Sequence, residues 1–528
     1  MTPFMHFRLW LREGPSAERG LATAAALLAC ALLAWAVLPT ASDTLEVAGG
    51  GLAPGPVSSA ATGAGSGAGA GAAVEGAEPG TTPVSGGVAV QGAGAGEASG
   101  GGGDGGQAAG PSAPGGSAAP AAEAGGGCDN RATDVGVTEG EVLIGVVIYS
   151  LGEGNSLLGI PPAQESKDVW NAVIDQVNQA GGIQCRTVKA VFYEEFVLSA
   201  ESGRTACLQM QQDGVFALMN NLFNTPNRPC PMSAGIPNFW ATSPDKPLID
   251  RFPGLIMSFQ PDYERLFRDY VYGAKAMGFF DDLGPSAKVG ILDQSCNPER
   301  GQYLRGHLEA IGIPSSKWSA YNYGCTGAVP SPTDHNAAAL QFNRDGVTHV
   351  VTAHREAPSG FAAAAANQRL RPKYAMINDA SSPLANNANP PYHESFDGTL
   401  YISKTSEGAE YTPGATHTQA TADCTAITDA AGYPGPTDTG TLEGSLHALA
   451  CIHMKMFVAA AQRTMPLTRA GLGAGMAAVG DLDLSFPAGP SRFDDPKNLT
   501  GGQFWRPTVY RDQCTCVQLL EETWRPQF

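Results

Sequence analysis

The sequence predicts an α/β fold in which two parallel β-sheets are each covered by helices on both faces. From Cys128 onward, short continuous apolar segments alternate with segments whose apolar residues recur at helical spacing. That alternation is typical of buried parallel strands and of the helices that cover them. It restarts beyond Phe259-Gln260-Pro261, which indicates two lobes, each with its own sheet.

The first lobe opens with an apolar run at 142–149 (VLIGVVIY), as expected for a buried parallel strand. A helix is predicted at 167–180, where apolar residues recur at helical spacing and Gly181-Gly182 provides a C-terminal stop. The other elements expected in this lobe are strands at 187–193, 215–219 and 238–241 and a helix at 200–212.

The second lobe repeats this pattern of strands and helices. Its expected helices lie at 263–277, 301–311 and 359–369, and its expected strands at 288–293, 319–323, 349–352, 374–378 and 399–404. Two further helices, at 443–463 and 468–479, and a hairpin-like stretch at 508–520 complete the chain.

An uncharged apolar run at 21–38 is long enough to cross a membrane. Basic residues precede this run and none follows it closely, so residues 1–20 are expected in the cytoplasm and everything after the run outside. Two other interpretations stay open: a cleaved signal peptide, with small residues at 40–42, and lipidation of Cys30. All three interpretations export the folded part of the protein.

Residues 39–127 consist mainly of Gly, Ala, Ser, Pro and Thr. This composition cannot bury enough apolar surface to offset the entropy of ordering, so we expect a disordered linker. A flexible coil of this length would have a root-mean-square span on the order of 50 Å. The linker would therefore hold the folded part away from the membrane.

The charge and the short motifs exclude several classes of function. The formal net charge is −18, from 32 Lys and Arg residues against 50 Asp and Glu residues, so nucleic-acid binding is not expected. The chain contains no HExxH or GxSxG motif, and its Gly-rich segment lacks the lysine of a phosphate-binding loop. No catalytic residue, metal site or cofactor is predicted.

Several motifs occur in a fixed order along the second part of the chain. VTEGEVLIG at 137–145 is followed by NQAGGI at 178–183 and FYE at 192–194. These motifs resemble the type I periplasmic binding proteins, most of all the branched-chain amino-acid binding proteins of ABC transporters. The resemblance spans about residues 134–525.

The resemblance implies two doubly wound lobes joined by three crossing segments, with a small-molecule ligand held in the cleft between them. It also implies an ABC transporter permease as partner and no cofactor. The chain would then divide into lobe 1 at 128–261 and 403–500 and lobe 2 at 262–402 and 501–528.

Ligands of open parallel sheets bind beyond the carboxyl ends of the strands, so the residues that follow each strand are the candidates. The resemblance implies a carboxylate site at the turn Trp240-Ala241-Thr242, with Asn220 or Asn221 in place of the family's hydroxyl. It also implies an ammonium partner at Asp397. The full set of candidates is Asn220, Asn221, Trp240, Ala241, Thr242, Asn297, Arg355 and Asp397.

Structural roles stay open for four of these residues. Thr242 could cap a helix, Trp240 could pack in the core of lobe 1, and Asp397 could belong to an ordinary turn. Arg355 could form a surface ion pair.

Ten of the 11 cysteines lie outside the apolar run, an even number in a compartment where disulfides persist. Metal binding is the alternative, but no CxxC pair occurs. We expect disulfides within each lobe and none between the lobes. The first candidates are Cys207 with Cys230 and Cys424 with Cys451, followed by Cys296 and Cys325.

The sequence therefore predicts an extracytoplasmic solute-binding protein that captures a small polar ligand, an amino acid or a related compound, for an ABC importer. Two alternatives remain: a membrane-tethered sensor that acts through a partner protein, and an extracellular enzyme whose site the sequence does not reveal.

Overall fold

The computed structural model describes residues 128, 131–150, 152, 155, 160–196, 199–221, 227–324, 330–354, 357–378, 393–406, 409, 412, 415, 417–435, 442–485, 487, 489–514 and 516–528. The apolar run at 21–38 and the linker at 39–127 lie outside these residues. Within the described part of the chain, no helix is both long and apolar enough to cross a membrane.

The first sheet has six strands in the order β13-β5-β4-β3-β1-β2, and all its neighbours run parallel. The interior strand β1, between β3 and the edge strand β2, is buried on both faces, which explains why its sequence is a continuous apolar run and not an alternating one. The strands are β1 (Glu141–Ser150), β2 (Thr187–Phe196), β3 (Ala217–Asn221), β4 (Asn238–Trp240), β5 (Ile256–Ser258) and β13 (Leu499–Thr500).

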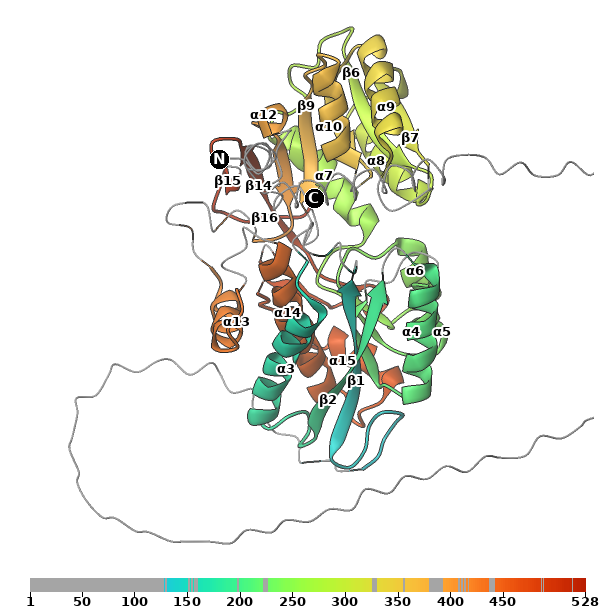
Figure 1. The fold of residues 1–528 in the computed structure, drawn as a ribbon, viewed down its shortest axis with the longest axis vertical. Helices are drawn as coiled ribbons and strands as arrows, with labels where there is room; N and C mark the ends of the chain where they lie inside the picture. The colour runs from blue at the N-terminus through green and yellow to red at the C-terminus, as the bar shows by residue number, and fades with distance from the viewer. Residues whose placement is uncertain are drawn as a thin grey trace, which may run out of the picture. The chain divides into compact units, whose positions relative to one another are not determined.

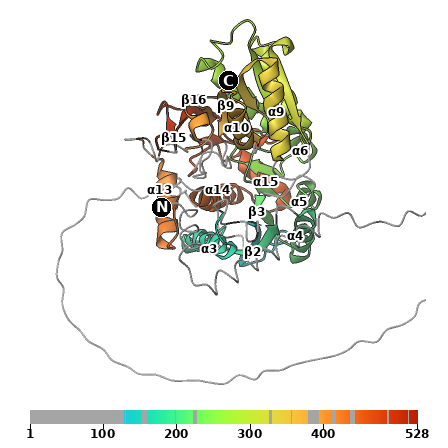
Figure 2. The same ribbon diagram turned by 45° about the horizontal axis from the view of Figure 1, so that its top comes forward.

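Helices cover both faces of this sheet (Figure 1, Figure 2). One face packs against α3 (Ala163–Gln179), α14 (Leu442–Gln462) and α15 (Arg469–Ala477), with α13 (Gln419–Ala430) outside them. The other face packs against α4 (Ala200–Asp213), α5 (Pro229–Ser233) and α6 (Lys246–Arg251). The parallel α/β architecture predicted from the sequence is confirmed here.

The second sheet has the order β15-β14-β10-β9-β8-β6-β7. β6 to β10 run parallel, whereas β14 and β15 pair antiparallel along one edge. The strands are β6 (Lys288–Gln294), β7 (Trp318–Tyr323), β8 (Val347–Thr352), β9 (Lys373–Asn378), β10 (Leu400–Ser403), β14 (Phe504–Arg511) and β15 (Cys516–Leu519), with β16 (Arg525–Pro526) beside β14.

The helices of the second sheet also lie on two faces (Figure 1). One core contains α7 (Tyr263–Ala276) and α8 (Pro298–Ala310), and the other contains α9 (Pro332–Asp345) and α10 (Ala357–Asn367), with α12 (His393–Phe396) beside it. Small elements complete the fold: η2 (Ser315–Lys317) and the two-stranded pair β11 (Asp481–Leu482) and β12 (Ser491–Arg492).

The chain passes between the two sheets three times: after β5, after β10 and after β13. Arg265 joins the first and third passages, because its guanidinium donates to Asp262 Oδ2 at 2.9 Å and to the carbonyls of Thr500 and Gly501 at 2.8 and 3.0 Å. These hydrogen bonds hold the passages together as one hinge.

A buried ion pair holds the second passage in the same hinge. Lys404 Nζ bonds Asp269 of α7 and also donates to the Gly502 carbonyl at 3.1 Å. The side chains of Lys404 and Asp269 are 1% and 0% exposed. Burial lowers the pKa of Lys404, an effect that the charge of Asp269 opposes.

The disulfides predicted for Cys207 with Cys230 and for Cys424 with Cys451 are confirmed. Two more join Cys128 to Cys185 and Cys514 to Cys516. Cys296 is also disulfide-bonded, and Cys325 lies outside the described residues. Each of the four bridges joins positions of the same lobe.

The segment after Cys128 is fixed at the amino edge of the first sheet. Cys128 forms a disulfide with Cys185, which lies shortly before the start of β2. The buried guanidinium of Arg186 donates to the carbonyls of Arg131 and Thr138 at 2.8 Å each. The start of the folded part is therefore held by a disulfide and by hydrogen bonds from a buried guanidinium.

Candidate functional site

Both sheets have a topological switch point, where consecutive connections leave a strand in opposite directions. β1 lies between β2 and β3 in the first sheet, and β6 lies between β7 and β8 in the second. Ligands of doubly wound sheets bind beyond the carboxyl ends of the strands at such points. The residues that end β1, β3, β6 and β8 are therefore the first to examine.

A pocket lies at the switch point of the first sheet. It comprises about 340 Å³ of space between atoms, part of which is open solvent. Its walls come from the ends of β1 and β3 and from the amino-terminal halves of α3 and α14. The lining residues are Ile148, Tyr149, Ile160, Ser166, Val169, Trp170, Asn220, Leu446 and His447.

Asn220 occupies the carboxyl end of β3 in a left-handed backbone conformation, with φ of 57°. Outside glycine, Asn is among the residues that adopt this conformation most readily, and such residues often mark functional sites. The side chain is 6% exposed, and its Nδ2 donates to the Val147 carbonyl at 2.8 Å. Its Oδ1 is buried without a hydrogen-bond partner among the described residues.

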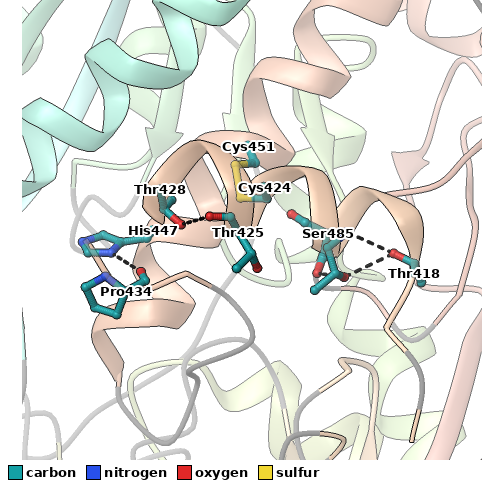
Figure 3. Close-up of a disulfide and its surroundings, with 9 residues drawn as sticks. Thr418, Cys424, Thr425, Thr428, Pro434, His447, Cys451 and Ser485 are labelled. Carbon is teal, nitrogen blue, oxygen red and sulfur yellow. Dashed lines mark hydrogen bonds between the residues drawn. A yellow bond between two sulfur atoms is a disulfide. The ribbon is translucent and has the colours of Figure 1, made fainter. Parts of the chain in front are cut away.

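His447 is fixed on the opposite wall by contacts to two other elements. Its Nδ1 donates to the Pro434 carbonyl at 2.8 Å, and its Nε2 lies 3.3 Å from Glu165 Oε1 of α3. One helical turn further along α14, the Cys424–Cys451 disulfide joins this helix to α13 (Figure 3). Polar contacts therefore position the ring, and the disulfide fixes the helix that carries it.

The loops that follow β4 and β6 meet in an ion pair between the two lobes. Asp245, which precedes α6, accepts from Arg300 of α8 at 3.3 Å from Nε and 3.2 Å from Nη2. Arg228 donates to the same carboxylate at 3.3 Å. The Arg300 guanidinium also lies 3.6 Å from the ring centroid of Tyr263, a cation–π contact. The carboxyl edges of the two sheets thus face each other.

The second sheet presents aromatic and imidazole side chains at its carboxyl edge. Tyr323, at the end of β7, lies 3.3 Å from His335 Nδ1 through its hydroxyl and 5.4 Å from the ring of His354 between centroids. Burial lowers the pKa of His335, and the neighbouring His354 lowers it further. The same edge also carries the ion pair of Asp293, near the end of β6, with Arg305.

The structure brings several predicted site residues to these edges. Thr242 follows β4, where its hydroxyl accepts from Trp240 Nε1 at 3.2 Å, and Asn297 directly precedes α8. Trp240 is fully buried in a core with Met232, Ile249 and Ile256. Ala241 is likewise buried in the main core. Neither Trp240 nor Ala241 is available as a cleft wall.

Asp397 lies on the opposite edge from the other candidates. It precedes β10, which runs parallel to β9 and ends at Ser403, so Asp397 is at the amino end of this strand. It is exposed and accepts from the Asp512 backbone N at 3.1 Å. This is the position of a turn residue. A turn was one of the two roles that the sequence left open for Asp397, the other being contact with an ammonium group. The side chain of Asn221 and all of Arg355 lie outside the described residues.

Sequence reasoning missed His447, Asp245 and Arg300. A histidine near the start of a largely apolar helix is a usable signal for His447. Asp245 stands just before a Lys-Pro helix start, where the sequence suggests a capping role, but its side chain makes no capping hydrogen bond in the structure. Nothing local indicates that Arg300 would reach a residue of the other lobe.

No family model matches the sequence, and no curated protein matches it either. Solved structures do match. A fatty acid ABC transporter substrate-binding protein from Thermomonospora curvata is 13% identical, with a TM-score of 0.54 over 74% of this chain and 93% of that one. An extracellular ligand-binding receptor from Verminephrobacter eiseniae is 14% identical, with a TM-score of 0.54 over 71% and 99%.

The chain has the fold of the type I periplasmic binding proteins. An ABC transporter substrate-binding protein from Desulfitobacterium hafniense in complex with Leu also shares it, at 15% identity and a TM-score of 0.51 over 72% of this chain and all of that one. These neighbours are named as binding proteins or receptors and not as enzymes. At such identities the likeness establishes the shared type I fold and leaves the ligand open.

Proposed function

We propose that this protein is an extracytoplasmic solute-binding protein that captures a small polar ligand between its two lobes for an ABC importer. The observation that carries the proposal is the Asp245–Arg300 ion pair, since it joins loops at the carboxyl edges of both sheets. Two switch points that face one cleft can bind the same solute from both sides.

The hinge supports the same function. Arg265 and Lys404 join the three passages, so the two lobes can move as rigid bodies about a small common region. Closure around a ligand excludes water and strengthens each polar contact inside the cleft. The cleft residues in this proposal are Asn220, Thr242 and Asn297, with Asn221 and Arg355 as further candidates.

The N-terminal part of the chain completes the proposal. Residues 21–38 would anchor the protein in the membrane, and residues 39–127 would let the binding module reach the permease of the transporter. An amino acid or a related compound is the solute class that we favour, in keeping with the neighbour solved with Leu.

The test is the capture of a solute by the full chain. The protein is purified in mild detergent, and compounds released on denaturation are identified by mass spectrometry. Chain freed of solute should bind the same compound one to one, with a negative heat-capacity change from closure of the cleft. Consumption of that compound, followed by NMR, would indicate an enzyme and refute the proposal.

A further inference from the structure

Asn220 combines three features that rarely occur together. The residue is 6% exposed, its φ is 57°, and one of its two polar side-chain atoms, Oδ1, has no hydrogen-bond partner among the described residues. A buried polar atom without a partner is costly, and in native proteins it usually indicates a missing ligand or water. Asn220 lines the pocket, so the pocket is the place to look for the group that Oδ1 lacks.

The orientation of the amide is set by its other atom. Nδ2 lies 2.8 Å from the Val147 carbonyl oxygen. Turning the amide over would place Oδ1 against that oxygen, so that two acceptors would face each other at hydrogen-bond distance. The amide therefore offers an acceptor as its unpaired atom. An acceptor needs a partner with an N–H or O–H group.

The remaining lining gives no support to a carboxylate. The nine lining residues that the structure describes include no Lys or Arg, and four of them are aliphatic. The Glu165 carboxylate lies directly behind His447, which adds negative charge on that side. A carboxylate here would lose its water and meet no cation except the His447 ring, which already faces Glu165, whereas an ammonium group would meet Asn220 Oδ1.

We propose that Asn220 Oδ1 binds a hydrogen-bond donor of the solute, namely an ammonium or a hydroxyl group, and that any carboxylate of the solute lies outside this pocket. The inference rests on the proposed function and specifies the chemistry of its ligand. It reverses the polarity expected from the sequence, where the amide was taken as a donor to a carboxylate.

The test uses full-length protein and four probes that share one branched hydrocarbon skeleton. The probes are leucine, 3-methylbutylamine, 3-methylbutan-1-ol and 4-methylpentanoate, and their binding is measured by ligand-observed NMR and calorimetry. The amine or the alcohol should bind and the acid should not. Binding of the amine alone assigns an ammonium, and equal binding of the amine and the alcohol assigns a neutral donor.

Two variants suit the backbone at this position, Asn220→Gly and Asn220→Asp, because both residues tolerate a positive φ. Asn220→Gly should weaken the probes that bind by at least about 10-fold, as expected for loss of a buried hydrogen bond. Asn220→Asp keeps an acceptor for the solute, and its second oxygen must carry a proton to satisfy the Val147 carbonyl, so it should preserve affinity for the amine and leave the acid unbound. Arg369→Gly is the control, because it also introduces Gly at a residue with positive φ (61°) but at an exposed position. It measures the effect of Gly on the backbone alone.

Three results would overturn the inference. If 4-methylpentanoate binds and Asn220→Gly abolishes its binding, the site takes a carboxylate, while solute capture stands. If Asn220→Gly leaves every affinity unchanged, water alone satisfies Oδ1, and again solute capture stands. If wild-type protein retains no solute and binds no probe, the inference and the proposed function fail together.

Discussion

The buried Lys404–Asp269 pair at the hinge should be one of the most sensitive points of the molecule. Removing one partner of a buried ion pair leaves an uncompensated charge and typically costs about 3–5 kcal/mol. Asp269→Asn would leave the Lys404 ammonium with the Gly502 carbonyl and a neutral amide. We therefore expect the free energy of unfolding of this variant to fall by about 3–5 kcal/mol at pH 7.

The loss should depend on pH in a defined direction. Burial lowers the pKa of Lys404 in the folded state, and Asp269 is the largest effect that raises it. Without Asp269 the folded pKa falls further below the unfolded value of about 10.4. The penalty is then complete below the folded pKa and disappears as the pH rises toward the unfolded pKa. The difference from wild type should shrink between pH 7 and pH 10.

Urea unfolding followed by tryptophan fluorescence, with the disulfides intact, measures these changes. Lys404→Met is the matched variant, and it leaves Asp269 with the backbone N of Phe528 at 3.1 Å and with Arg268. The double variant Asp269→Leu with Lys404→Met should recover most of the stability, since no buried charge remains. A loss below about 1 kcal/mol for Asp269→Asn, or a loss that does not change with pH, would refute this reasoning.

Three further predictions concern the cleft, a disulfide and a buried histidine. Arg300→Gln should weaken solute binding by roughly 10-fold, because it removes the charged contact to Asp245 across the cleft, and unchanged affinity in calorimetry would place closure elsewhere. Replacing Cys424 and Cys451 by Ser removes a cross-link between positions 27 residues apart and should lower the free energy of unfolding, measured by heat or urea, by about 3 kcal/mol. A much smaller loss would mean that packing alone holds α13 on α14. Burial lowers the pKa of His453 to about 3, so its stabilising effect is complete above the unfolded pKa of about 6.5 and is lost as the pH falls toward 3. His453→Phe should therefore flatten the acid limb of the stability profile, and an identical acid limb in both proteins would contradict this.

The sequence was sufficient for the elements with a strong apolar pattern. β1 shows the continuous apolar run of a buried strand, and α7 shows regular helical spacing, so both were expected within a few residues of their observed bounds. The three-residue strand β5 is too short to carry any pattern. Helix α9 was missed although its signals exist: the Ser331 side chain caps its first turn and Gly346 ends it in a left-handed conformation.

The site was harder to predict than the fold, because it depends on contacts between distant segments. Asn220 could be expected at a strand end, but only its bond to Val147, 73 positions away, determines which atom of the amide remains for a ligand. The Asp245–Arg300 pair joins residues 55 positions apart that belong to different lobes. Asp397 shows the opposite failure: an acidic residue before a glycine matched a family motif, but its strand presents it at the wrong end.

The attachment at Cys128 has a mechanical consequence. A pull on the chain before Cys128 reaches the disulfide first and passes through it to Cys185, next to β2. The hydrogen bonds of Arg186 lie further along the chain and carry the load only after the disulfide. A covalent bond therefore bears the load, and the strand that receives it lies at the edge of its sheet. The pull acts on the amino edge of the sheet, away from the carboxyl edge where the pocket lies. The folded part can be held firmly at one end while the loops at its other end stay free of that load.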